Sequence, residues 1–168
     1  QDVVNNYEID DLIYIFLSFG EEQHAKKIAT SIIQNRPINT TEELVNLIKS
    51  AIPRQNPKYT KSSIRRIFQS IRIEVNNELN EIVTSLDSIK SFIKTGGVMI
   101  FLTYHSIEDK IIKKFIDNEV KGCLCDPKFA ICTCKNIAQF KLGKFKKRKP
   151  SSSEIKSNPR SKSAVLRY

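Results

Sequence analysis

The sequence predicts an α/β fold in which a mostly helical region precedes a strand that ends at a polar site. Three observations support this prediction: helical spacing of apolar residues over the first half of the chain, the apolar run 98–102, and the polar block directly after that run. The 168 residues, 40% of them hydrophobic, suffice for one ordinary domain or for a small domain and part of another. The run 98–102 is far shorter than the roughly 18 apolar residues of a membrane span, so we expect no membrane partner.

The beginning of the chain is predicted to be all-helical. Apolar residues recur at helical spacing over 8–19 and over 21–35. Thr40-x-x-Glu43 is a capping box that predicts the start of a third helix, which ends before Pro53. The proline-containing stretch 53–61 is typical of a connection or of a loop that faces nucleic acid.

A long amphipathic helix is predicted from Ser62 or Ser63 to Ile93, bent or broken near Thr84. Gly96-Gly97 then separates this helix from a strand over 98–103, and Ser106-x-x-Asp109 predicts the capping box of the next helix. Two short terminal strands are predicted over 140–145 and 163–168. The chain therefore divides into a helical region, 1–62, a helix, strand and helix, 63–122, a cysteine-paired loop, 123–135, and basic strands and tail, 136–168.

The end of the predicted strand is the candidate catalytic site. Ligands of open α/β sheets bind beyond the carboxyl ends of the strands, which is where Tyr104 and His105 emerge, with Glu108 close behind them. Helix capping is a sufficient alternative explanation for Ser106 and Asp109. The helix dipole alone favours Glu108 at a helix N-terminus.

The net charge of +10 is concentrated towards the C-terminus. A basic block interleaved with Phe140 and Phe145 suits a phosphate-backbone partner, whereas a solvated basic tail remains the alternative. Arginines near the start of the long helix are equally compatible with phosphate contacts and with ordinary solvent exposure. The candidate RNA-binding residues are Arg65, Arg66, Arg72, Lys144, Lys146, Lys147, Arg148, Arg160, Lys162 and Arg167.

The four cysteines form two C-x-C pairs, Cys123 with Cys125 and Cys132 with Cys134. Four thiolates so close in sequence are a candidate zinc site, although C-x-C differs from the usual C-x-x-C spacing. Unligated thiols remain an equal alternative. The intracellular setting that the rest of the sequence favours argues against a stable disulfide.

Four blocks, taken in order, carry a family resemblance. They are Phe19-Gly20-Glu21-Glu22, the segment FQSIRIEVNNEL at 68–79, YHSIEDK at 104–110 and NPRSKSAVLR at 158–167. Together they resemble the RsmH (MraW) family, whose members use S-adenosylmethionine to methylate the N4 amine of a cytidine in small-subunit ribosomal RNA. The resemblance implies that His105 accepts a hydrogen bond from the amine or orients the base, and that Tyr104 stacks on a flipped-out cytosine.

The resemblance also implies a partial fold. The chain would be the C-terminal part of a Rossmann-like class I methyltransferase sheet, preceded by a mostly helical insert. The cofactor-binding half, with its glycine-rich loop, would precede Gln1, because no G-x-G-x-x-G turn occurs here. Alone, the chain would be inactive and would need that half and small-subunit ribosomal RNA as partners. The alternative is a noncatalytic RNA-binding module. We expect a cytoplasmic protein if it is bacterial, and a mitochondrial or plastid one if eukaryotic.

Overall fold

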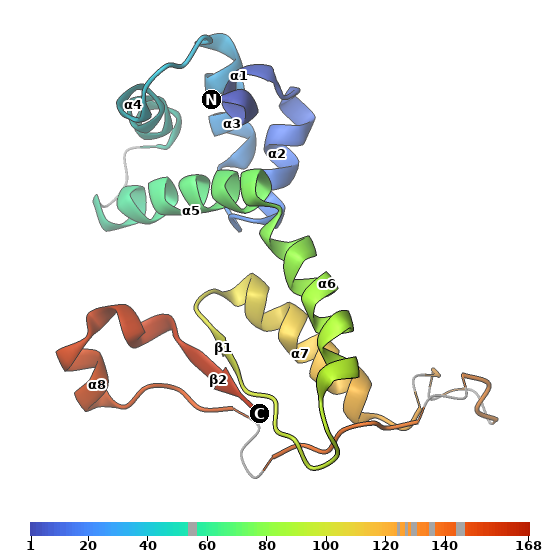
Figure 1. The fold of residues 1–168 in the computed structure, drawn as a ribbon. Helices are drawn as coiled ribbons and strands as arrows, with labels where there is room; N and C mark the ends of the chain where they lie inside the picture. The colour runs from blue at the N-terminus through green and yellow to red at the C-terminus, as the bar shows by residue number, and fades with distance from the viewer. Residues whose placement is uncertain (54–56, 124, 127, 129–130, 135–136, 144–146) are drawn as a thin grey trace. The chain divides into compact units, whose positions relative to one another are not determined.

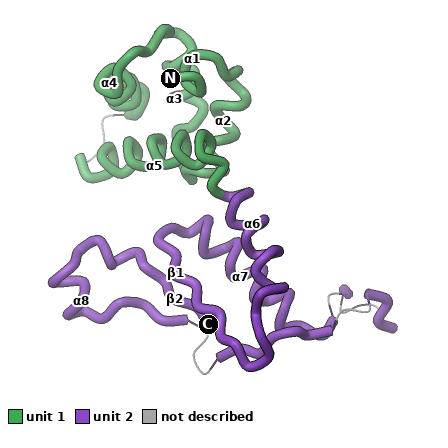
Figure 2. Tube along the Cα trace, viewed as in Figure 1, with its two compact units in different colours: residues 1–78 green, residues 79–168 purple. Residues whose placement is uncertain are grey.

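The chain forms two compact units, residues 1–78 and residues 79–168, in a computed structural model (Figures 1 and 2). The structure describes residues 1–53, 57–123, 125–126, 128, 131–134, 137–143 and 147–168. No helix in these ranges has the length and apolar character needed to cross a membrane.

Unit 1 is helical, as the sequence predicts. Phe16, Ile28, Ile48 and Ile67 are fully buried in one apolar core that its helices share. The short first helix is absent from the prediction because five residues are too few to show a helical period. The described helices are α1 (Asp2–Asn6), α2 (Ile9–Ser18), α3 (Ala25–Gln34), α4 (Thr41–Ala51) and α5 (Pro57–Asn76).

The predicted capping box at the start of α4 is confirmed. The Thr40 hydroxyl accepts the Glu43 N–H at 3.1 Å, and the Glu43 carboxylate accepts the Thr40 N–H at 3.4 Å. Each bond satisfies a backbone donor that the first turn of a helix leaves unpaired.

The predicted long helix is two helices. The break falls at Asn77, not near Thr84: α5 ends at Asn76, Asn77 has φ of 51°, and α6 spans Glu78–Ile89. Asparagine tolerates this left-handed backbone better than most residues, and it ends the helical path of α5. The boundary between the two compact units follows Glu78, and Ile67 of α5 is buried in the unit 1 core. The sequence predicts a domain boundary earlier, between residues 62 and 63.

Unit 2 contains a two-stranded antiparallel sheet. β1 (Phe101–Thr103) pairs with β2 (Val165–Arg167), with Phe101 opposite Arg167 and Thr103 opposite Val165. The predicted strands over 98–103 and 163–168 are therefore present but shorter. Residues 140–143 form no strand, and 144–145 lie outside the described residues. The other elements are 3₁₀ turns at Lys90–Phe92 and Pro159–Ser163, and the helices α7 (Ser106–Val120) and α8 (Ser152–Ser157).

The two faces of the segment that leads into β1 have different surroundings. Phe101 makes an edge-to-face contact with Phe115 of α7, at 6.1 Å between ring centroids. Val98, Ile100 and Leu102, which alternate with it, are 70%, 64% and 54% exposed. Successive side chains of a strand point to opposite faces, so α7 covers one face and the other presents three apolar side chains.

Candidate functional site

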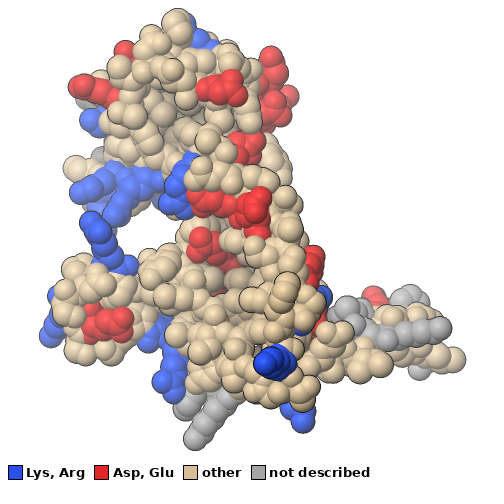
Figure 3. Space-filling view, in the orientation of Figure 1, with Lys and Arg blue, Asp and Glu red and all other residues tan. Residues whose placement is uncertain are grey.

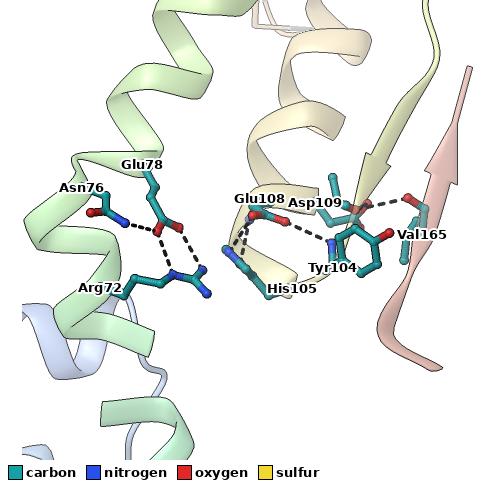
Figure 4. Close-up of polar contacts among 9 residues, drawn as sticks. Arg72, Asn76, Glu78, Tyr104, His105, Glu108, Asp109 and Val165 are labelled. Atoms are coloured by element: carbon teal, nitrogen blue, oxygen red, sulfur yellow. Dashed lines mark hydrogen bonds and ion pairs between the residues drawn. The ribbon is translucent and has the colours of Figure 1, made fainter. Parts of the chain in front are cut away.

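The candidate site is the connection between β1 and α7 (Figure 4). The sequence predicts Ser106 and Asp109 as a capping box, and this prediction is wrong: His105 is the N-cap, and its Nδ1 accepts the Glu108 N–H at 3.3 Å. The extended backbone of His105, with φ −138° and ψ 160°, lets its ring take the place of the usual hydroxyl or carboxylate cap.

The three predicted catalytic residues lie together. The Glu108 carboxylate accepts the Tyr104 N–H at 3.0 Å, and its other oxygen lies 2.9 Å from His105 Nε2. Because Nδ1 of His105 accepts a hydrogen bond, the neutral imidazole carries its proton on Nε2, beside that carboxylate. Tyr104 is 54% exposed. The arrangement therefore combines an accessible aromatic ring with a carboxylate that accepts the Tyr104 N–H and lies beside the His105 ring.

Asp109 is held by the last strand. Arg167 donates to it from Nε at 2.7 Å and from a terminal nitrogen at 2.8 Å, and the Thr103 hydroxyl lies 3.4 Å away. The Arg167 hydrogen bonds hold the pKa of Asp109 below its usual range. Arg167, predicted to contact RNA, is only 8% exposed and is instead part of this internal ion pair. Sequence reasoning missed the pair because its members are 58 residues apart.

Two of the three predicted arginines of α5 are engaged within unit 1. Arg66 lies 2.7 Å from the buried carboxylate of Glu22, which also accepts the Ser63 hydroxyl at 2.6 Å. Burial raises the pKa of Glu22, but the hydrogen bonds from Ser63, the His24 N–H and Arg66 outweigh it, so the pKa lies below its usual range. Arg72 makes a two-point pair with Glu78, at 2.7 and 2.9 Å (Figure 4).

An exposed basic stripe runs along α5. We define it as Lys58, Lys61, Arg65 and Arg72, whose spacing of three, four and seven residues places them on one helical face. Figure 3 shows Lys and Arg side chains gathered over this helix. Sequence reasoning singled out the two arginines and missed the two lysines, although the helical period could have found them.

The predicted basic residues of the tail are exposed where the structure describes them. Lys147, Arg148, Arg160 and Lys162 are all exposed, and Arg148 forms a backbone bridge with Leu166. Lys147 Nζ lies 3.8 Å from the Asp109 carboxylate. Lys144 and Lys146 lie outside the described residues.

The four cysteines converge. The Sγ of Cys123 lies 3.4 Å from that of Cys132 and 3.8 Å from that of Cys134, and Cys132 and Cys134 are 3.5 Å apart. All four sulfur atoms, that of Cys125 included, lie within 4.8 Å of one another. None is in a disulfide.

Comparisons with known proteins agree over the whole chain. The model of the MraW methylase family matches residues 1–168. The ribosomal RNA small subunit methyltransferase H of Clostridioides difficile strain 630 is 41% identical over 169 residues, which cover 99% of this chain and 54% of the relative. The protein of that name from Halothermothrix orenii is 38% identical, covering 98% and 54%, and that from Dehalococcoides mccartyi is 35% identical, covering 99% and 47%. The chain thus spans about half the length of these relatives.

Proposed function

The chain belongs to the MraW methylase family, and we propose that the protein to which it contributes transfers a methyl group from S-adenosylmethionine to the N4 amine of a cytidine in small-subunit ribosomal RNA. The names of the relatives support the ribosomal RNA substrate. We assign the acceptor site to Tyr104, His105 and Glu108 because these residues lie together at the end of β1.

The cluster suits the acceptor side of this reaction. Methyl transfer forms an N–C bond at the amine, breaks the C–S bond of the donor, and releases one amine proton. Neither nitrogen of His105 offers a free lone pair in the tautomer that this contact implies, because Nδ1 accepts the Glu108 N–H and the proton of a neutral ring is then on Nε2. We therefore assign proton acceptance to the Glu108 carboxylate and the positioning of that carboxylate to His105. The exposed ring of Tyr104 would stack on the flipped-out base.

The cofactor belongs, in this proposal, mainly to the remainder of the full-length protein. S-adenosylmethionine supplies an activated methyl group, but a phosphate- or nucleoside-binding glycine turn does not follow β1, where the chain reads Tyr104-His105-Ser106. The exposed apolar face of Val98, Ile100 and Leu102 supports a Rossmann-like sheet that continues with strands from that remainder. That unit 1 is a substrate-recognition insert stays part of the proposal.

RNA recognition is assigned to the basic stripe of α5 and to the exposed tail residues. Lys61 and Arg65 are both exposed and lie one helical turn apart, on one face of α5, where both can contact the phosphate backbone. The ion pairs of Arg66 and Arg167 make these two arginines structural in the proposal.

The test is methyl transfer by the full-length enzyme to isolated small ribosomal subunits, measured with labelled S-adenosylmethionine. We expect Glu108→Gln to lower kcat by about 10²-fold or more with little change in KM, because the amide oxygen still accepts the Tyr104 N–H but cannot take up a proton. Tyr104→Phe should retain activity and Tyr104→Ala should raise KM. Lys113→Ala, an exposed change on α7, is the control.

Two results would overturn these assignments. Undiminished kcat in Glu108→Gln would remove Glu108 as the proton acceptor. RNA binding without methyl transfer by the full-length wild-type protein would support a noncatalytic RNA-binding module instead. For the 168-residue chain alone, calorimetry should show RNA binding and no binding of S-adenosylmethionine. Cofactor binding by this chain would contradict a cofactor site located elsewhere.

A further inference from the structure

The cysteines lie in a segment that leaves the fold and returns to it at one point. We call residues 121–138 the cysteine lobe. α7 ends at Val120, and the backbone carbonyl of Glu119 accepts the N–H groups of both Gln139 and Phe140, at 3.1 and 3.3 Å. The two ends of the lobe are therefore fixed beside the same turn of α7.

The described part of the lobe has no apolar core. Its described residues are exposed, Ile131 and Ile137 at 77% and 79%, except Cys125, which is half-buried. The described residues of the lobe, which include no helix, strand or buried apolar side chain, gain too little free energy from packing to offset the entropy of ordering them. A cross-link would supply the missing stabilisation, and the converging cysteines are groups that can make one.

The sulfur positions match a metal site. Four thiolates around zinc at about 2.3 Å form a tetrahedron with edges of about 3.8 Å. The Sγ distances of 3.4, 3.5 and 3.8 Å among Cys123, Cys132 and Cys134 are close to that edge and far from the roughly 2.05 Å of a disulfide bond. Sulfur ligands in a tetrahedral set favour zinc among the common divalent ions.

From this geometry we propose that Cys123, Cys125, Cys132 and Cys134 bind one zinc ion that cross-links the two halves of the lobe. The C-x-C spacing does not prevent this, because the two pairs approach each other from opposite ends of the lobe and each supplies two adjacent corners. Asp126 is not needed as a ligand, since its carboxylate accepts the Lys128 N–H. The proposal is independent of the methyltransferase function.

The test uses the 168-residue chain, whose four cysteines are the only ones it contains. Purified under reducing conditions, it should contain one zinc per chain by elemental analysis. Exchange for cobalt should give the intense visible bands of a tetrahedral thiolate complex. Cys125→Ser and Cys134→Ser should each weaken metal binding at least tenfold, and Asp126→Asn should bind as wild type. Amide exchange in α7 and β1 shows whether each variant has kept the rest of unit 2.

Three outcomes would overturn the proposal. One is a metal-free chain with four thiols that react freely. Another is a mass lower by four hydrogens, which indicates two disulfides under the same conditions. The third is an Asp126→Asn variant that loses the metal, which would show that the four sulfur atoms are not the ligand set.

Discussion

Arg167 and Asp109 form a two-point ion pair that joins the last strand to the first turn of α7, with donor–acceptor distances of 2.7 and 2.8 Å. Asp109 follows Glu108 directly, so the same pair fixes the start of the helix that presents the candidate site. β2 therefore contributes to the site without supplying a residue that faces it. The pair also accounts for an arginine with 8% exposure in an otherwise solvent-facing basic tail.

Breaking this pair should destabilise unit 2. Arg167→Met leaves the Asp109 carboxylate without its two strongest donors, and we expect the free energy of unfolding to fall by about 2–3 kcal/mol. Amide exchange in β1 and β2 measures this loss. Lys147→Ala is the control, because Lys147 lies 3.8 Å from the same carboxylate and is exposed. It should cost less than about 0.5 kcal/mol. Equal losses in the two variants would contradict the role given to the pair.

The stability that Asp109 contributes should depend on pH in one direction. Its folded-state pKa is depressed below the ordinary value of 3.8 by Arg167, so the unfolded chain takes up the proton first as the pH falls. The contribution is therefore complete well above about pH 4 and is lost as the pH falls through the depressed folded-state pKa. The measurement is the difference in unfolding free energy between wild type and Asp109→Asn from pH 7 to pH 2. That difference should shrink below about pH 4, and a difference that grows with acid would be inconsistent with the pair.

Gly20 should tolerate no side chain. A Cβ there would lie 2.7 Å from the Phe16 carbonyl oxygen and 3.0 Å from that of Arg66, both of them backbone atoms. Gly20→Ala should therefore move α5 away from the turn after α2 and cost about 1–3 kcal/mol in unit 1. Gly122→Ala is the matched control, because nothing lies within 4 Å of the added carbon. Thermal unfolding measures both, and an unchanged midpoint in Gly20→Ala would show that this contact is not tight.

The basic stripe of α5 should contribute to RNA affinity through charge. Replacing Lys61 and Arg65 by alanine removes two exposed cations, and the slope of log affinity against log salt should fall by about 2 for a fragment of small-subunit ribosomal RNA. Lys49→Ala, an exposed change in the last turn of α4, should leave the slope unchanged. An unchanged slope in the double variant would place the RNA on another surface.

The sequence predicted best where local patterns decide the structure. The capping box of Thr40 and Glu43 and the helices of unit 1 depend on residues three or four apart, so they are visible in the sequence. The break at Asn77 was misplaced because an apolar period runs through it: Ile73 on one side and Leu86 on the other are both buried. A single residue in the left-handed region interrupts a helix without changing that period.

The residues of the candidate site were predicted from the sequence, but their hydrogen bonds and ion pairs were not. The gathering of Tyr104, His105 and Glu108 followed from their place after an apolar run, whereas the cap was assigned one residue too late because serine is a more common N-cap than histidine. The roles of Arg66 and Arg167 depend on contacts with Glu22 and Asp109 that are distant in sequence. A count of charged residues along the sequence places such arginines on the surface, because it contains no information on burial.

Because the chain returns to the Glu119 carbonyl, we expect the protein to tolerate insertions and deletions within the cysteine lobe. A segment whose ends meet at one backbone group can be lengthened, shortened or replaced, because the helix before it and the chain after it keep their paths. Replacing 121–138 by a short glycine-containing turn should therefore leave the packing of α7 on β1 intact, and the same point is a natural insertion site for a reporter.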